Sequence, residues 1–276
     1  MRLREYSLPA GWYPRDSAEI SRFLADFTGQ KATYRAAVSP HAGWYYSGRL
    51  AARAVSGLQP QADTIAVLGG HLPAGMPPLF ALEDAAKTPL GPLPIDGELR
   101  ALLQKELDGE EDRWQDNTIE VLLPMVRFFF PDASLLWLRL PAESSSFEAG
   151  KAIARAAEKL NRKVNVLAST DLTHYGANYG FSPHGTGSAA LKWVKEVNDR
   201  NFIQALESGD PGEVLRRGNQ EKSSCSPGAV LGAMGFAQEA GLGKASLLEY
   251  STSADVLSGG EKPPHSFVGY AACAFG

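Results

Sequence analysis

Cysteine is scarce in this chain. The 276 residues include two, Cys225 and Cys273, which are too few for the disulfide framework of a small secreted scaffold. No basic segment followed by an apolar one opens the sequence, so no secretory leader is expected. Both observations predict a protein of the reducing cytoplasm.

The sequence also lacks an excess of basic residues and long apolar runs. Lys and Arg number 27 against 31 Asp and Glu, which gives a net charge of −4. Nucleic acids and anionic lipid surfaces attract basic proteins, so neither is an expected partner. The most apolar stretch, VLLPMVRFFFP, contains Arg127 and two prolines and is shorter than the roughly 20 apolar residues of a membrane helix.

Several catalytic and nucleotide-binding signatures are missing as well. Neither a Walker loop nor a GxGxxG motif follows a predicted strand, so nucleotide binding is not expected. A GxSxG nucleophile elbow is absent, which argues against a serine hydrolase of the α/β-hydrolase type.

Short β-branched runs alternate with helical patterns along the chain. The strand-like runs are TYRAAVS, DTIAVLGG, SLLWLRL and VNVLAS, and helical patterns cover residues 48–58, 147–161, 187–208 and 228–237. This alternation predicts an α/β fold with a mixed sheet and helices on both faces. Two further strand-like runs, KASLLEYSTS and SFVGYAACAF, flank a Gly- and Pro-rich loop at 258–265 and are expected to extend one edge of the sheet. No repeat or long linker interrupts the pattern, which predicts a single domain over residues 1–276.

Three of the five histidines follow predicted strands. His41 comes after TYRAAVSP, His71 after DTIAVLGG, and Asp171 with His174 after VNVLAST. Ligands of open α/β sheets bind beyond the carboxyl ends of the strands, where these loops converge. We therefore expect these side chains to lie around one crevice, with the carboxylate of Asp171 able to orient the imidazole of His174 or to support proton transfer.

Cys225 lies in SSCSPGAVLG, in which Ser226 and Pro227 are typical of a helix start. A sulfur just before a helix N-terminus is stabilised as a thiolate and could be a metal ligand or a nucleophile. The alternative is a small buried apolar residue, which is the expectation for Cys273 in its strand-like run.

The stretch DNTIEVLLP fits a capped amphipathic helix, with Asn117 as the cap and Glu120 three residues later. Pro124 lies inside this predicted helix and should kink it. The tyrosines of PHAGWYYSG, Tyr45 and Tyr46, are expected either to form a packing wall or to face a substrate.

Imidazoles together with a thiolate suit ferrous iron, zinc or copper, whereas magnesium and calcium prefer oxygen ligands. Three protein ligands would leave an open coordination position, as catalytic metal sites do. The residues alone thus predict an α/β protein with a transition-metal site or a Cys/His site.

The ordered blocks PHAGWYYSG, VLGGH, DNTIEVLLP, STDLTHYG and SSCSPGAVLGAM resemble the Memo family, over most of the chain from about residue 6 to the final strand. That family is similar in fold to class III extradiol dioxygenases, which are non-haem iron enzymes. The resemblance implies metal ligation by His41, His71 and Cys225, with ferrous iron first and copper or zinc as alternatives. It also implies an acid/base position at His174 beside Asp171, and a functional association with a radical SAM protein.

Two departures from the family pattern stand out. LGGH is one residue shorter than the family's LGPSH, which affects the approach of His71, and Asn117 replaces the histidine of EHSIEVQLP while Glu120 is kept. With Tyr45 and Tyr46, Glu120 is expected to line the pocket.

Three functions are consistent with these residues. The first is a metal-dependent, dioxygenase-like enzyme that acts on a small aromatic or other oxygen-reactive substrate. The second is a non-catalytic protein that binds copper, iron or a partner through the same pocket. The third is a metal-free hydrolase with Cys225 as nucleophile, activated by His41 or His71.

Overall fold

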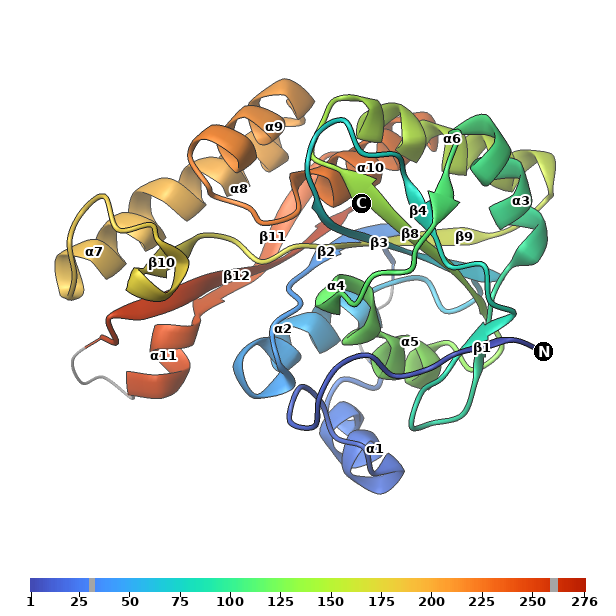
Figure 1. The fold of residues 1–276 in the computed structure, drawn as a ribbon, viewed down its shortest axis with the longest axis horizontal. Helices are drawn as coiled ribbons and strands as arrows, with labels where there is room; N and C mark the ends of the chain where they lie inside the picture. The colour runs from blue at the N-terminus through green and yellow to red at the C-terminus, as the bar shows by residue number, and fades with distance from the viewer. Residues whose placement is uncertain (30–32, 259–262) are drawn as a thin grey trace.

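The computed structural model describes residues 1–29, 33–258 and 263–276 and contains a large mixed sheet at its centre (Figure 1). Four parallel strands form the middle of this sheet, in the order β2 (Ala36–Ser39), β9 (Val164–Ser169), β3 (Thr64–Leu72) and β8 (Ser134–Pro141). Their carboxyl ends therefore meet at one edge of the sheet, which is where the predicted site residues follow β2, β3 and β9.

Antiparallel strands complete the sheet on the side of β2. The C-terminal strand β12 (Ser266–Phe275) pairs with β2, and β11 (Ala245–Thr252) and β10 (His174–Gly176) both pair with β12. The predicted extension of the sheet by the last two strands is confirmed, while residues 259–262 of the loop between them lie outside the described part. The short strands β4 (Leu79–Phe80) and β7 (Glu110–Glu111) follow β8 on the other side, and β1 (Leu3–Arg4), β5 (Ala85–Ala86) and β6 (Leu93–Pro94) form a small second sheet.

Helices cover both faces of the central sheet (Figure 1). Along β2, Ala36 and Val38 belong to one buried apolar cluster and Ala37 to another, as the alternation of a strand requires. The first cluster contains buried residues of α3 (Gly97–Glu106), α6 (Ser145–Lys159), α8 (Asp199–Ser208), α9 (Pro211–Gln220) and α10 (Pro227–Glu239). The second contains those of α1 (Ser17–Ala25), α2 (Trp44–Ser56), α4 (Asn117–Glu120) and α5 (Leu123–Phe129). The predicted α/β class, with a mixed sheet and two helical layers, is confirmed.

Helix α10 carries glycine where other elements approach closely. A Cβ added to Gly228 would lie 2.1 Å from the carbonyl oxygen of Pro141, at the end of β8. A Cβ on Gly150 of α6 would lie 1.9 Å from the carbonyl oxygen of Gly232 of α10. These glycines allow the first turn of α10 to contact the end of β8 and thereby fix the position of Cys225, which precedes that turn.

Two local predictions need correction. Residues 117–129 do not form one kinked helix: α4 ends at Glu120 and α5 begins at Leu123, with Pro124 in its first turn, where a missing N–H costs nothing. The cap of α4 is Asp116, whose Oδ1 accepts from the N–H of Thr118 at 2.8 Å, and not Asn117. Capping by Asp116 leaves the side chain of Asn117 free to reach the site.

The predicted helix at 187–208 is present but changes its geometry along its length. It begins as α7 (Ser188–Trp193), continues as a π-helical segment (Val194–Asn198) and ends as α8. The remaining short helices are a 3-10 turn (Ala177–Tyr179) and α11 (Ser253–Ser258). Within the described residues, no helix combines the length and apolar character needed to cross a membrane.

Candidate metal centre

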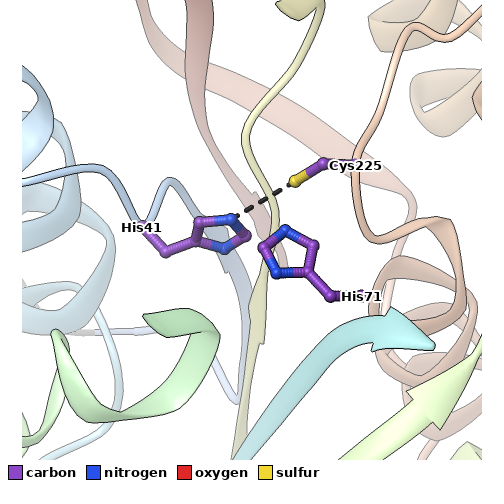
Figure 2. Close-up of side chains that lie close together, drawn as sticks. All are labelled: His41, His71 and Cys225. Carbon is purple, nitrogen blue, oxygen red and sulfur yellow. Dashed lines mark hydrogen bonds between the residues drawn. The ribbon is translucent and has the colours of Figure 1, made fainter. Parts of the chain in front are cut away.

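Three side chains from distant parts of the sequence converge at the carboxyl ends of the parallel strands. His41 follows β2, His71 lies at the end of β3, and Cys225 comes directly before α10 (Figure 2). One nitrogen of each imidazole and the sulfur lie within 4.8 Å of one another. The two rings meet edge to face with centroids 5.0 Å apart, and Cys225 Sγ is 3.3 Å from His41 Nε2. This group could hold a metal ion.

The buried side chain of His41 is fixed by a neighbouring strand. Its Nδ1 lies 2.9 Å from Ser169 Oγ at the end of β9, and that hydroxyl donates its own proton to the carbonyl oxygen of Thr118. Because the hydroxyl proton is already committed, Ser169 accepts from His41, which places the imidazole proton on Nδ1. When the ring is neutral, the lone pair of Nε2 then points toward Cys225.

His71 is oriented by a carboxylate. Its Nδ1 lies 2.9 Å from Oδ2 of Asp116, which leaves Nε2 to face the sulfur. The backbone of His71 has a φ of 56°, and the pairing of β3 with β8 is irregular between Gly69 and Leu72. The shortened LGGH segment therefore turns its last residue into the site through an irregular strand end. A Cβ on Gly70 would lie 2.3 Å from that of Ser226, so this position must be glycine.

Asp116 was not among the predicted site residues, and it is part of a buried charge network. Its Oδ2 lies 3.3 Å from the guanidinium of Arg139, which also lies 3.3 Å from Oδ1 of Asp112 and donates from Nε to the carbonyl oxygen of Gly70 at 3.0 Å. The Arg139 side chain is 4% exposed and that of Asp112 is fully buried. A clue was present in the sequence, since an arginine inside the apolar run SLLWLRL requires a buried acidic partner.

Hydrogen bonding in this cluster shifts the pKa values of its members. Desolvation lowers the pKa of His71, but the hydrogen bonds to Asp116 and to the Cys225 sulfur outweigh it and raise the pKa to about 10. Burial likewise opposes the charge on Cys225, yet the adjacent His41 and His71 hold the pKa of the thiol well below its ordinary value. Without metal, the thiolate therefore pairs with imidazolium.

The position of Cys225 depends on Asp171. The N–H of Asp171 donates to Cys225 Sγ at 3.3 Å, and the N–H of Cys225 donates to the carbonyl oxygen of Asp171 at 3.2 Å. Ser226 is the N-cap residue of α10, as predicted, although its side chain does not make the capping hydrogen bond. By contrast, Cys273 is buried in β12, where desolvation raises the pKa of its thiol to about 12.

Asp171 also connects the cluster to His174. Its Oδ1 accepts from the N–H of His41 at 2.8 Å, and its Oδ2 lies 3.9 Å from the Nε2 atoms of both His41 and His174. Burial raises the pKa of this carboxyl. Asp171 and His174 lie close together without a helical turn between them, since residues 170–173 form no regular element and the chain enters β10 at His174.

A cavity of about 760 Å³ opens beside the cluster. His41, His71, Asp171 and His174 all line it, and Tyr46, Tyr179 and Tyr270 form aromatic parts of its wall. The N-terminal segment Ala10–Trp12 closes one side. Its volume is in the range of sites for small organic ligands.

Of the three residues predicted to line the pocket, one lines the cavity and two do not. Tyr46 lines the cavity, whereas Tyr45 is 69% exposed and is not part of the lining. Glu120 is buried away from it and binds the N-terminal segment: its carboxylate accepts from the N–H groups of Ser7 and Leu8 and from the hydroxyl of Tyr13. Glu120 therefore does not line the cavity but holds in place the N-terminal segment that closes one side of it.

Asn117, which stands where the family has a histidine, does line the cavity. Its Nδ2 donates to the carbonyl oxygen of His41 at 3.1 Å. The amide thus holds the turn that carries the first imidazole, and it has no proton to exchange.

Known proteins resemble this chain over nearly its whole length. The family model described as Memo-like protein matches residues 4–274. A MEMO1 family protein of Thermococcus onnurineus is 29% identical over 293 residues, covering 99% of both chains, and one of Methanosarcina barkeri is 31% identical over 281 residues, covering 98% of both. The crystal structure of an uncharacterized protein from Escherichia coli K12 covers 88% of this chain and 100% of its own with a TM-score of 0.50 and 13% identity, which shows a common fold. The chain belongs to the Memo family.

Proposed function

We propose that the protein binds a divalent transition metal through His41, His71 and Cys225, and that the ion is ferrous iron. The observation that carries this proposal is the orientation of the two imidazoles. Each has its Nδ1 engaged by a neighbour, Ser169 or Asp116, and each directs Nε2 toward the sulfur, where a metal would replace the Nε2 proton. Hydrogen bonding of the second ring nitrogen is the usual support of a metal-ligating histidine.

The donor set supports an ion of intermediate or soft character. Two imidazole nitrogens and a thiolate bind iron, zinc and copper, and the lowered pKa of Cys225 favours the thiolate. When bound, a metal with an open position supplies Lewis-acid or oxygen chemistry. Ferrous iron is chosen because the family resemblance is to non-haem iron enzymes.

The cavity next to the cluster supports a catalytic role on a small aromatic or oxygen-reactive substrate. Tyrosine rings line it, and a polar group entering it meets His174, whose Nε2 lies 3.9 Å from Asp171. In this proposal His174 accepts or donates a proton at Nε2, and the carboxylate of Asp171 stabilises its charged form. The segment Ala10–Trp12 restricts the access of water.

The test is anaerobic purification followed by metal analysis of the wild type, Cys225→Ala and Cys273→Ala. Cys273→Ala is the matched control, because that thiol is buried in β12 away from the cluster. We expect bound iron near one equivalent in the wild type and the control, and at least a tenfold loss in Cys225→Ala. Equal metal in all three proteins would refute the ligand assignment.

Turnover is tested separately with catechol-like compounds. We expect His174→Gln to keep the metal but to lose turnover about 10²–10⁴-fold, the usual contribution of a general acid or base. If the wild type shows no turnover but binds Cu(I) tightly, the second function, a non-catalytic copper-binding protein, is favoured, since thiolates prefer soft ions.

The distance of 3.3 Å between Cys225 Sγ and His41 Nε2 also supports the third function, a metal-free hydrolase with a Cys-His pair. Ester hydrolysis that persists in the metal-free protein and disappears in Cys225→Ala would support this function over the metal-dependent one.

A further inference from the structure

A second, smaller pocket reaches the same cluster from another direction. It has a volume of about 220 Å³ and is lined by Cys225, Ser224, Lys222 and Phe181, together with His174 and Tyr179. His174 and Tyr179 also line the larger cavity, and their rings lie 4.9 Å apart, so these two side chains form the partition. Cys225 lines the small pocket and does not line the large one.

The size of the small pocket restricts its occupant. Pockets for drug-sized ligands usually measure about 300–1,000 Å³, so a volume of about 220 Å³ suits a molecule of a few non-hydrogen atoms. The walls combine the aromatic residues Phe181 and Tyr179 with the polar residues Ser224 and Lys222. Such a wall can hold both a short apolar body and a polar end.

The charge of the pocket is set by Lys222. No carboxylate lines it, and the ammonium of Lys222 forms no ion pair within residues 1–29, 33–258 and 263–276. Its Nζ lies 5.3 Å from the centre of the Phe181 ring, a cation–π contact that leaves the ammonium protons available for a ligand. The backbone of Lys222 has a φ of 51°, in the left-handed region, near the start of the chain segment that joins α9 to Cys225.

We propose that this pocket is a second binding site, which takes a small organic carboxylate between Lys222 and Cys225 and is entered independently of the large cavity. The carboxylate pairs with the ammonium, and the short carbon chain lies against Phe181 with its far end at the sulfur. The proposal concerns the protein's own side chains and does not require a bound metal.

The experiment compares alkylation of Cys225 by iodoacetate and by the neutral iodoacetamide, in metal-free protein carrying Cys273→Ala. In both reactions the thiolate displaces iodide and forms one S–C bond, so the ratio of the two rates cancels any change in the fraction of thiolate. Iodoacetate is itself a two-carbon carboxylate and serves as the probe. We expect its rate to saturate with concentration, and that of iodoacetamide to remain linear.

Lys222→Asn removes the charge and suits the backbone, because Asn is one of the residues that adopt positive φ. We expect the ratio of the iodoacetate rate to the iodoacetamide rate to fall about tenfold, which corresponds to a loss of roughly 1.4 kcal/mol of attraction. An unchanged iodoacetamide rate would show that the fold is intact. Lys192→Asn is the matched control, since Lys192 is exposed on α7 and its side chain is 71% accessible. Equal ratios in the two variants would overturn the proposal.

A second variant tests the route of entry. Ala10→Trp fills part of the large cavity at an exposed position of the N-terminal segment. We expect unchanged labelling by both reagents; loss of labelling by both would show that the sulfur is reached through the large cavity and would also overturn the proposal. Because no metal is present, neither result depends on whether the proposed metal binding holds.

Discussion

Replacing Asp116 by Asn should weaken metal binding without disturbing the helix that Asp116 caps. Oδ1 of Asp116 accepts from the N–H of Thr118 at 2.8 Å, and Oδ2 faces Nδ1 of His71 at 2.9 Å. Asn is as good an N-cap as Asp, so its Oδ1 retains the first hydrogen bond. Its NH₂ group then faces Nδ1, and two donors cannot pair.

When the ring loses one of its two protons, the one that remains is then expected on Nε2, the atom that faces Cys225 and that a metal needs unprotonated. Loss of the orienting partner of a ligating histidine usually costs 10- to 100-fold in metal affinity, which corresponds to about 1.4–2.8 kcal/mol. We expect this loss for Asp116→Asn in anaerobic competition titrations against a chromophoric chelator, with Fe²⁺ and with Zn²⁺.

The matched control is Asp210→Asn. Asp210 caps α9 in the same way, with Oδ1 accepting from the N–H of Glu213 at 3.0 Å, and it is not part of the cluster. The metal affinity of Asp210→Asn should equal that of the wild type. If Asp116→Asn also stays within a factor of two of the wild type, the orientation of His71 does not depend on the carboxylate and the reasoning fails.

Three further outcomes follow from the same contacts. Since the pKa of His71 is raised to about 10 in the metal-free protein, metal must displace a proton from it at neutral pH. The affinity for the metal should therefore rise about tenfold per pH unit for each proton released on binding. Calorimetry in buffers of different ionisation enthalpy should detect the release of at least one proton. Glu120→Ala leaves the part-buried N–H groups of Ser7 and Leu8 and the buried hydroxyl of Tyr13 without this acceptor. It should lower the free energy of unfolding in urea by about 3 kcal/mol and speed proteolysis only in the N-terminal segment; uniform proteolysis would contradict this. Burial raises the pKa of Asp199 to about 7, so the folded state holds its proton longer than the unfolded state. This contribution to the free energy of unfolding is fully present below about pH 4 and is lost as pH rises through 7. Asp199→Asn should remove up to about 4 kcal/mol of this change in stability with pH. If the free energy of unfolding depends on pH identically in the wild type and the variant, Asp199 is not its source.

The strands and the main helices were predictable because their periodicities are strong and local. The apolar run at 228–237 and the amphipathic pattern at 147–161 predicted α10 and α6, and the positions of His41 and His71 after strands predicted their convergence. Because parallel strands have their carboxyl ends at the same edge of a sheet, residues that follow three different strands could be expected to lie close together. Cys225 could be added since a helix start follows it directly.

What could not be predicted depends on contacts between residues far apart in the sequence. Asp116 supports His71 only because β3 lies beside β8 and Arg139 on β8 holds the carboxylate. Glu120 was expected at the pocket, but the N-terminal segment packs over α4 and takes up its carboxylate. The break between α4 and α5 comes from the preference of Pro124 for the first turn of a helix. The local sequence pattern alone could not distinguish a kinked helix from the start of a second helix.

The replacement of a family histidine by Asn117 limits where proton transfer can occur. An amide cannot donate and recover a proton at neutral pH, and this one is already bonded to the carbonyl oxygen of His41. Among the imidazoles that line the cavity, His41 and His71 have both ring nitrogens engaged once Nε2 binds a metal, because Ser169 and Asp116 take the Nδ1 protons. His174 is then the imidazole whose ring remains available, on the wall next to Tyr179 and within reach of Asp171. If the proposed metal binding holds, we therefore expect a chemistry that uses a single acid or base at the His174 wall rather than two histidines on opposite sides of the substrate.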